Sequence, residues 1–299
     1  MLSGLSDTIG PRGLVLSMNG KVCLVTGATH GIGLVTAHAL AAAGATVLVH
    51  GRDAQAGAAV VADIARASGN SAVRFVRADF MHLDEVRELA GELARLPRLD
   101  VLINNAGLMN GGARMCTAEG YDATFGVNHL APFLLTNLLL PKLGQSAPAR
   151  VVMVASEAHR GAGWLDFDDL MNARVGFLRA YQRSKLANLL FMRALAPRLK
   201  GSGVTVNALH PGFVHSQLFR GVRGPLRLLL STVLRPFMRS PRRGAQTSIY
   251  LATSPEVEGE SGGYYFDCRR IEPSAAARCP ESAARLWSES VRLTALSRA

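Results

Sequence analysis

A glycine-rich turn between an apolar run and an alanine-rich segment constrains the fold of this chain more than any other feature. The run Val22-Cys23-Leu24-Val25 predicts a buried strand, and residues 34–43 predict a helix that closes at Gly44. A second apolar run, residues 46–50, predicts the next strand. The order strand, glycine turn, helix, strand is one βαβ unit, in which a helix joins two parallel strands.

The turn between the first strand and the helix carries three glycines, at positions 27, 31 and 33. Glycines allow the backbone to approach a pyrophosphate closely, and the helix N-terminus presents unpaired N–H groups to the anion. A glycine triplet often marks only a turn, but the flanking strand and helix favour a dinucleotide site. We therefore predict cofactor contacts from Gly27, Thr29, His30, Gly31, Ile32 and Gly33.

The residues that end the second strand, His50-Gly51-Arg52-Asp53, bear on the choice between the two nicotinamide cofactors. A carboxylate there bonds the ribose 2′-hydroxyl of NAD(H), whereas a basic residue accommodates the 2′-phosphate of NADP(H). Arg52 comes first after the glycine, so we predict that NADP(H) is preferred over NAD(H). Asp53 is the alternative ribose ligand if the loop is one residue longer.

The alternation of strands and helices continues along the chain. Predicted strands span residues 73–76, 99–103, 150–154 and 204–209, and predicted helices span 54–68, 83–93, 117–143 with a break at Pro132, and 177–195. This order predicts an α/β fold: a single-domain Rossmann fold with a doubly wound parallel sheet of about seven strands and helices on both faces. Residues 20–299 would form this domain, after a leader of low information at 1–19.

Tyr181 and Lys185 are four residues apart in the last predicted helix, so they share one face of it. A tyrosine loses its proton near pH ~10, and a nearby fixed positive charge favours the phenolate. Such a pair can exchange a proton with a substrate. An isolated pair is more often solvated surface, so the other motifs of the chain decide its meaning.

Charge and composition limit the classes of partner. The formal charge of +11 predicts attraction to an anion, whether a phosphate-bearing cofactor, a membrane surface or nucleic acid. No recognition motif accompanies the charge, so we expect no nucleic acid. The four cysteines and eight histidines lack metal-ligand spacing, so we expect no metal and reduced thiols. No run approaches the ~18 apolar residues of a spanning helix, which predicts a cytoplasmic protein, at most peripheral to a membrane.

The motifs together resemble those of the short-chain dehydrogenases/reductases. They follow in that family's order: Thr26-Gly27-x-x-x-Gly31-Ile32-Gly33, Asp79, Asn104-Asn105-Ala106-Gly107, Asn128, Ser156, Tyr181-x-x-x-Lys185 and Pro211-Gly212. The match covers roughly residues 20–290. The surroundings of Tyr181, the segment His210-Pro211-Gly212-x-Val214, the tail around Tyr264 and the long gap between Ser156 and Tyr181 look like the retinol dehydrogenase branch.

The resemblance implies a role for each motif residue. Tyr181 would be the general acid or base on the substrate oxygen, and Ser156 would polarise that oxygen. Lys185 would lower the pKa of Tyr181 and bond the nicotinamide ribose, and Asn128 would support a proton-relay water. Further cofactor contacts are implied at Asp79 and Phe80 near the adenine, at Asn105, Ala106 and Gly107, and at Pro211, Gly212, Val214 and Ser216 near the nicotinamide.

The implied activity is the NADP(H)-dependent interconversion of a small lipophilic alcohol and its aldehyde or ketone. Residues 213–245 would form a substrate lid, although arginines punctuate an apolar run at 217–243 that could also contact a membrane. A catalytically silent NADP(H)-binding sensor or scaffold is the alternative class, and a steroid, quinone or protochlorophyllide-type reductase is the alternative enzyme. Family members often pair through the helix bearing the tyrosine, which predicts a homodimer or homotetramer.

Overall fold

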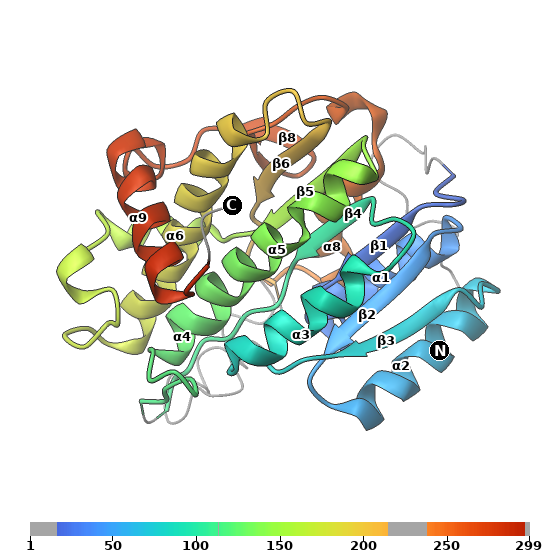
Figure 1. The fold of residues 1–299 in the computed structure, drawn as a ribbon, viewed down its shortest axis with the longest axis horizontal. Helices are drawn as coiled ribbons and strands as arrows, with labels where there is room; N and C mark the ends of the chain where they lie inside the picture. Colours follow the sequence, from blue (N-terminus) through green and yellow to red (C-terminus); the bar gives the residue numbers. More distant parts are fainter. Residues whose placement is uncertain (1–16, 113, 215–237, 297–299) are drawn as a thin grey trace.

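A mixed eight-stranded sheet forms the centre of the molecule (Figure 1). The computed structural model describes residues 17–112, 114–214 and 238–296, so most of the predicted leader lies outside it. The strand order is β3-β2-β1-β4-β5-β6-β7-β8. The strands are β1 Val22–Val25, β2 Thr46–Gly51, β3 Val73–Arg77, β4 Val101–Asn104, β5 Ala149–Val154, β6 Val204–Leu209, β7 Tyr264–Phe266 and β8 Arg269–Ile271.

The last strand is the one that departs from the predicted sheet of about seven parallel strands. β8 pairs with β7 antiparallel, whereas the other neighbours are parallel. Asp267 and Cys268 join the two, with φ values of 46° and 59°. Two residues with positive φ make the tight turn whose twist suits a hairpin. The strand is three residues long and carries no apolar run, so its residues show no strand pattern.

Helices cover both faces of the sheet, as predicted (Figure 1). One layer holds α1 Gly31–Ala42, α2 Ala54–Ser68 and α8 Pro241–Thr253, and the other holds α3 Leu83–Ala94, the short α4 Ala123–Phe125, α5 Ala131–Gln145, α6 Phe177–Arg198 and α9 Pro280–Leu293. Alternate strand residues supply two separate cores: Leu24 packs into the core beneath α3, α5 and α6, and Cys23 and Val25 pack into the core beneath α1. Burial on both faces explains why the strands read as continuous apolar runs.

The segment predicted as one helix over 117–143 differs from the expectation in two ways. It begins only at Ala123, where Asp122 accepts a hydrogen bond from the N–H of Phe125 at 2.9 Å and caps the helix. It does not break at Pro132, because that proline lies in the first turn of α5, directly after a π-helical turn over Gly126–Leu130. The π-helical turn contains Asn128.

The continuous helical run Ala123–Gln145 also corrects the expectation that no segment is apolar enough to span a membrane. Its 23 residues, with a mean hydropathy of 1.3, meet that criterion by length and composition. However, 83% of the apolar window is buried inside this fold. Burial in the core of this domain therefore accounts for the apolar composition.

The helix that carries Tyr181 is enclosed by its own chain. Of the 22 residues of α6, 14 are buried. α9 packs along it, and Trp287 of α9 lies against Phe133 and Phe191 with ring centroids 5.2 and 5.9 Å away. The guanidinium of Arg198 stacks on the indole at 4.1 Å. α9 thus covers part of α6, and the predicted homodimer or homotetramer remains a prediction.

Candidate functional site

The glycine turn after β1 is packed too closely for side chains at two of its positions. A Cβ on Gly27, whose φ is +62°, would lie 2.8 Å from the Cα of Ala106, and one on Gly33 would lie 2.5 Å from the Asn105 amide nitrogen. Gly31, with φ +61°, begins α1. The side chain of His30 makes no cap hydrogen bond to α1, and the first turn contains no acidic residue. The N–H groups and positive dipole end of α1 are therefore suited to an anionic group such as a pyrophosphate.

Two residues to which the sequence assigned no role hold this turn in place. The Thr26 hydroxyl accepts the N–H groups of Asn105 and Ala106, each at 2.9 Å. His50 accepts the N–H of Gly27 on Nδ1 at 3.2 Å and donates from Nε2 to the Ala78 carbonyl at 3.1 Å. Burial lowers the pKa of His50 to about 4, so its ring is neutral. A polar residue at the end of an otherwise apolar strand was the available signal for His50.

At the end of β2, the two residues predicted as alternatives near the ribose, Arg52 and Asp53, have different environments. Asp53 caps α2, and its carboxylate accepts the N–H of Ala56 at 3.0 Å. Arg52 is exposed directly after the strand. This arrangement favours Arg52 over Asp53 as the residue facing the cofactor. Arg77, at the end of β3, had no predicted role, yet its Nε donates to the Arg52 carbonyl at 3.2 Å.

The predicted adenine contacts Asp79 and Phe80 lie at the same edge of the sheet. The Asp79 carboxylate accepts the N–H of Met81 at 3.0 Å. Phe80 is buried and stacks on His50, with ring centroids 4.5 Å apart. The phenyl ring therefore supports the end of β2 from within the protein, and a direct contact between Phe80 and a cofactor would come from its backbone.

Tyr181, Ser156 and Lys185 converge at the carboxyl end of β5. Ser156 follows the strand, and its side chain lies close enough to the Tyr181 phenol to lower the pKa of the tyrosine. Tyr181 is 7% exposed. Lys185 Nζ donates to the Val154 carbonyl oxygen at 3.0 Å and lies 5.7 Å from the centroid of the Tyr181 ring. The structure therefore brings together three residues that the sequence separates by up to 29 positions.

Burial, and not the expected influence of Lys185, dominates the pKa of Tyr181. Burial raises the pKa of Tyr181 to about 12, and the nearby Ser156 side chain opposes that rise. Burial also lowers the pKa of Lys185 to about 8. The tyrosine is thus a neutral phenol near pH 7, a form that can donate a proton, and the lysine is a buried ammonium that loses its proton more readily than usual.

Asn128, the fourth predicted catalytic residue, joins two parts of the site. Its side-chain oxygen accepts the Leu108 N–H at 2.7 Å, and its nitrogen donates to the Leu108 carbonyl and the Ser184 hydroxyl, both at 2.9 Å. Ser184 in turn donates to the Tyr181 carbonyl at 2.8 Å. The side chain thereby connects the loop after β4 to the turn of α6 that carries the tyrosine. Ser184 had no predicted role, although its position three residues after Tyr181 places it on a nearby part of the helix.

Gly107 shows how closely the loop after β4 approaches this group. A Cβ at that position would lie 3.2 Å from the Asn128 side-chain oxygen and 3.5 Å from Lys185 Nζ. A larger residue would push against the two polar atoms. Three motifs that are far apart in the sequence, at 104–107, 128 and 181–185, therefore meet at one point.

The segment after β6 packs against the glycine turn. Gly212, with φ +80°, donates its N–H to His210 Nδ1 at 3.3 Å. A Cβ on Gly244 of α8 would lie 2.7 Å from Val214 and 3.3 Å from Ile32, so these two predicted cofactor residues approach the same point of α8. Pro211 precedes Gly212 at the strand end. Ser216 lies outside the described residues, as does most of the predicted lid, since residues 215–237 are not described.

A cavity of about 430 Å³ lies beside Ser156. The loops after β5 and β6, together with Arg239 and the end of β7, form its walls: Ser156, Glu157, Ala158, His210, Gly212, Phe213, Arg239 and Phe266. Phe266 stacks on His210 with ring centroids 4.2 Å apart, and the Arg239 guanidinium lies 4.5 Å from the centroid of the Phe266 ring. Aromatic rings and the side chain of Ser156 therefore line the same cavity.

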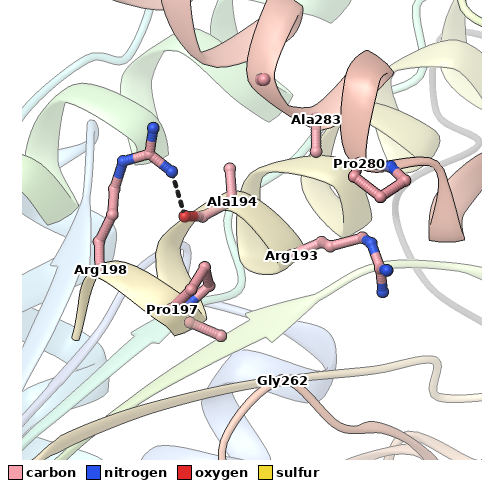
Figure 2. Close-up of a pocket in the computed structure, with 9 residues that line it drawn as sticks. Arg193, Ala194, Pro197, Arg198, Gly262, Pro280 and Ala283 are labelled. Atoms are coloured by element: carbon pink, nitrogen blue, oxygen red, sulfur yellow. Dashed lines mark hydrogen bonds between the residues drawn. The ribbon is translucent and has the colours of Figure 1, made fainter. Parts of the chain in front are cut away.

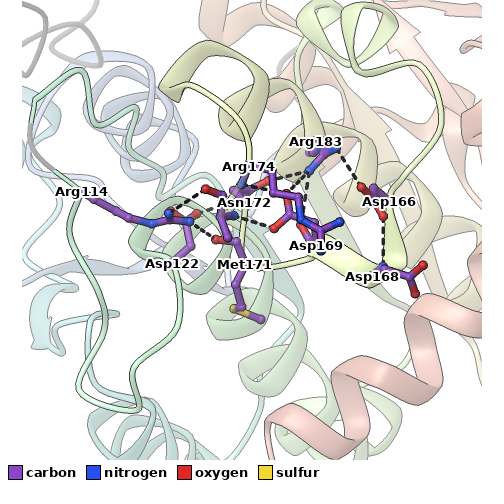
Figure 3. A network of polar contacts seen from close by, with 10 residues as sticks. Arg114, Asp122, Asp166, Asp168, Asp169, Met171, Asn172, Arg174 and Arg183 are labelled. Carbon is purple, nitrogen blue, oxygen red and sulfur yellow. Dashed lines mark hydrogen bonds and ion pairs between the residues drawn. The ribbon is translucent and has the colours of Figure 1, made fainter.

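The insert before α6 is held by a buried ion pair (Figure 3). Arg183, on α6, lies with Nη1 3.2 Å from Oδ2 of Asp169, and both side chains are largely buried. Arg114, from the loop after β4, donates to the Met171 and Ala173 carbonyls at 2.7 and 3.1 Å. In the sequence, this insert was marked only by the long gap between Ser156 and Tyr181. The structure shows that the ion pair anchors the insert to the helix that carries Tyr181.

A second cavity, of about 390 Å³, contains none of the predicted site residues. It lies between α6, α9 and Gly262 and is lined by Arg193, Ala194, Ala196, Pro197, Arg198, Gly262, Pro280, Ala283 and Ala284 (Figure 2). Within residues 17–112, 114–214 and 238–296, no group of three or more His, Cys, Asp or Glu side chains could hold a metal ion.

Comparison with known proteins agrees with this geometry. The family model described as short chain dehydrogenase matches residues 21–225. The chain is 47% identical to dehydrogenase/reductase SDR family member 13 of Bos taurus, over 95% of this chain and 76% of the relative. It is 44% identical to human retinol dehydrogenase 12, over 93% of this chain and 87% of the relative. Among solved structures, the Pseudomonas aeruginosa RhlG/NADP active-site complex has a TM-score of 0.67 and 31% identity, over 83% of this chain and 94% of that one.

Proposed function

Since the chain belongs to the short-chain dehydrogenase/reductase family and is similar to its retinol dehydrogenases, it is an oxidoreductase of alcohols and carbonyl compounds, and we propose that it uses NADP(H) to interconvert a lipophilic alcohol and its aldehyde or ketone. The observation that carries the proposal is the buried Tyr181 phenol beside the Ser156 side chain, with Lys185 Nζ 5.7 Å from the centroid of the tyrosine ring. A proton donor, a second hydroxyl and a cation are thereby gathered at one point beside a cavity.

Each group has a distinct part in carbonyl reduction. Ser156 donates a hydrogen bond to the carbonyl oxygen and holds it beside the phenol. Tyr181, neutral because burial raises its pKa, gives its proton to the oxygen as negative charge develops there. The Lys185 ammonium stabilises the resulting phenolate by its positive charge. In alcohol oxidation the same proton returns to the tyrosine. The bound nicotinamide supplies or accepts the hydride.

The cofactor would lie along the carboxyl edge of the sheet. The N-terminus of α1, with the close-packed Gly27 and Gly33, would receive the pyrophosphate, and Arg52 would receive the 2′-phosphate. Asp79 would face the adenine, and the segment from Pro211 to Val214 would face the nicotinamide. The preference for NADP(H) is supported by the exposed Arg52, by the use of Asp53 as a helix cap and by the similarity to RhlG, which was solved as a complex with NADP.

The lipophilic substrate class is supported by two observations. The cavity beside Ser156 includes the rings of Phe213 and Phe266, and the similar human protein is named retinol dehydrogenase 12. Residues 213–245 would contribute the lid. A silent NADP(H)-binding protein is less well supported, because such a protein has no chemical need for Ser156, Tyr181 and Lys185 together.

The test measures turnover by the wild type and by Tyr181→Phe, monitored as the change in NADPH absorbance. The substrates are retinal, a medium-chain aldehyde, a steroid ketone and a quinone. We expect Tyr181→Phe to lose about 10²- to 10⁴-fold in kcat on any substrate that is turned over, with NADPH binding by fluorescence unchanged. Tyr250→Phe, which alters a tyrosine of α8 bonded to Glu256, is the control and should keep wild-type turnover. Equal rates in Tyr181→Phe and the wild type would contradict the role of the tyrosine. Tight NADPH binding with no turnover on the panel would favour the sensor.

A further inference from the structure

The ends of β2 and β3 place two arginines side by side. In the parallel register of these strands, Gly51 is the partner of Arg77, and the N–H of Ala78 donates to the Gly51 carbonyl at 3.2 Å. Arg52 follows Gly51 directly. Arg52 therefore lies one position beyond the register partner of Arg77, where both strands reach the carboxyl edge of the sheet.

The side chain of Arg77 does not extend freely from β3. Its Nε donates to the Arg52 carbonyl at 3.2 Å, and its Nη1 lies 3.6 Å from Oε2 of Glu85. The same Glu85 oxygen accepts the N–H of Asp79 at 2.9 Å. The side chain is nevertheless 58% exposed. The guanidinium is thus tethered across the end of β2 and still open to solvent.

Of the carboxylates near the two arginines, Asp53 and Asp79 accept backbone N–H groups, and only Glu85 pairs with a guanidinium. Asp53, the nearest carboxylate along the chain from Arg52, is directed to the N-terminus of α2, where it accepts the N–H of Ala56. Glu85 offsets part of the charge of Arg77 from one side, while Arg52 adds a second guanidinium. A guanidinium pre-positioned by a hydrogen bond loses less conformational entropy when it binds a phosphate.

We propose that Arg77 is a second recognition residue for the 2′-phosphate of the cofactor and that Arg52 and Arg77 together determine the preference for NADP(H). The inference rests on the proposed function, because it requires the adenosine ribose to lie at the end of β2. It adds a residue on β3 whose position is set by strand pairing and not by proximity in the sequence. Two guanidiniums on one phosphate provide charge-assisted hydrogen bonds from two directions.

The experiment compares binding of 2′,5′-ADP and 5′-AMP by isothermal titration calorimetry, because these nucleotides differ by the phosphate in question. Arg77→Gln should weaken 2′,5′-ADP about 10- to 100-fold, the loss expected for a charge-assisted hydrogen bond, and leave 5′-AMP unchanged. Arg74→Gln is the matched control: it removes the same charge from the same strand, at an exposed position three residues, or roughly 10 Å, before the strand end. It should change 2′,5′-ADP binding less than about 2-fold.

A parallel measurement gives KM for NADPH and NADH, where Arg77→Gln should raise only the former. Arg77→Lys keeps the charge without the Nε donor, so partial retention of 2′,5′-ADP affinity in this variant would support direct contact with the phosphate. Equal weakening of both nucleotides by Arg77→Gln would show that Arg77 only supports the loop, and an unchanged affinity for both would exclude any role. A wild type that binds 2′,5′-ADP no more tightly than 5′-AMP would instead overturn the proposed NADP(H) preference itself.

Discussion

Lys185 Nζ donates a hydrogen bond to the carbonyl oxygen of Val154 at 3.0 Å, and so ties the face of α6 that carries Tyr181 to the last residue of β5. Ser156 lies two residues further along, and Tyr181 lies one helical turn before the lysine. The buried ammonium therefore has its hydrogen bond to the backbone and its charge beside the phenol. Both its stability cost and its catalytic use follow from that position.

The buried charge of Lys185 should destabilise the protein at neutral pH. Burial lowers its pKa to about 8, whereas in the unfolded chain the lysine stays charged up to about pH 10.4. The unfolded state therefore binds more protons between these values, and the free energy of unfolding should rise with pH across that window. Lys185→Met should raise the free energy of unfolding at pH 7 by roughly 1 to 3 kcal/mol and remove this rise. Urea unfolding at pH 7 and pH 9 measures both, with the exposed Lys200→Met as control; an unaltered pH slope would rule out Lys185 as its source.

The titration of Lys185 should also appear in the pH dependence of kcat/KM. In the proposed carbonyl reduction, the ammonium of Lys185 stabilises the phenolate that forms when Tyr181 gives up its proton, and this stabilisation is lost as the lysine is neutralised. We expect kcat/KM for reduction to fall above about pH 8, while the phenol itself, with its pKa raised to about 12, remains protonated. A pH profile from 6 to 10 with a saturating cofactor tests this. A profile that is flat to pH 10 would contradict the role given to the lysine charge.

Removing the side chain of Asn128 should affect both stability and turnover. Asn128→Ala leaves the Leu108 N–H and carbonyl and the Ser184 hydroxyl without their partner, and we expect a loss of roughly 2 to 4 kcal/mol in unfolding free energy. Because Ser184 bonds the Tyr181 carbonyl, kcat should also fall at least about 10-fold. Ser184→Ala removes a single link and should cost about 1 kcal/mol. A double-mutant cycle measured by urea unfolding and by kcat should show non-additive losses; simple additivity would mean that the two residues act separately.

Removing only the arginine of the buried ion pair in the insert should destabilise the protein more than removing both charges. Arg183→Met leaves the buried Asp169 carboxylate without its guanidinium partner, which costs about 3 to 5 kcal/mol in such pairs. Arg183→Met combined with Asp169→Asn removes the unpaired charge and should recover part of that loss. Arg174→Met, at an exposed position of the same segment, should be close to neutral. Chemical unfolding of the wild type and these three variants measures the difference, and equal stability of the single and double variants would refute the unpaired-charge explanation.

The packing of α9 against α5 and α6 predicts that removing its central ring will promote self-association of the protein. Trp287→Ala removes the ring that packs against Phe133 and Phe191, and we expect a loss of roughly 3 kcal/mol in stability together with partial exposure of the apolar surface of α5 and α6. Exposed apolar surface promotes self-association. Light scattering after size exclusion should therefore show more of the larger species in Trp287→Ala than in the wild type. Ser288→Ala, on the exposed side of α9, is the control. A smaller species in Trp287→Ala would instead mean that α9 itself supports an interface.

The elements predicted from sequence are those whose signals lie within a few residues of one another. The βαβ unit follows from apolar runs, glycine positions and helical periodicity, and Tyr181 and Lys185 share a face because of their spacing alone. The order of the motifs was enough to identify the family, which the comparisons confirm. β8 and the π-helical turn at Asn128 were missed, because a three-residue strand and a single wide turn are shorter than the windows in which periodicity can be seen.

Local patterns in the chain were therefore sufficient to predict the fold class, the family and which residues lie at the strand ends. Which atoms meet depends instead on the tertiary structure: Asn128 with Leu108 and Ser184, His50 with the glycine turn, and Arg77 with Arg52 across 25 residues of chain. The sign of the pKa shift of Tyr181 depends on it too, because the proximity of a lysine can be inferred from spacing, whereas desolvation depends on everything that packs around the phenol. Hydrogen-bond partners and burial arise from contacts between distant segments, and no local pattern of residues specifies them.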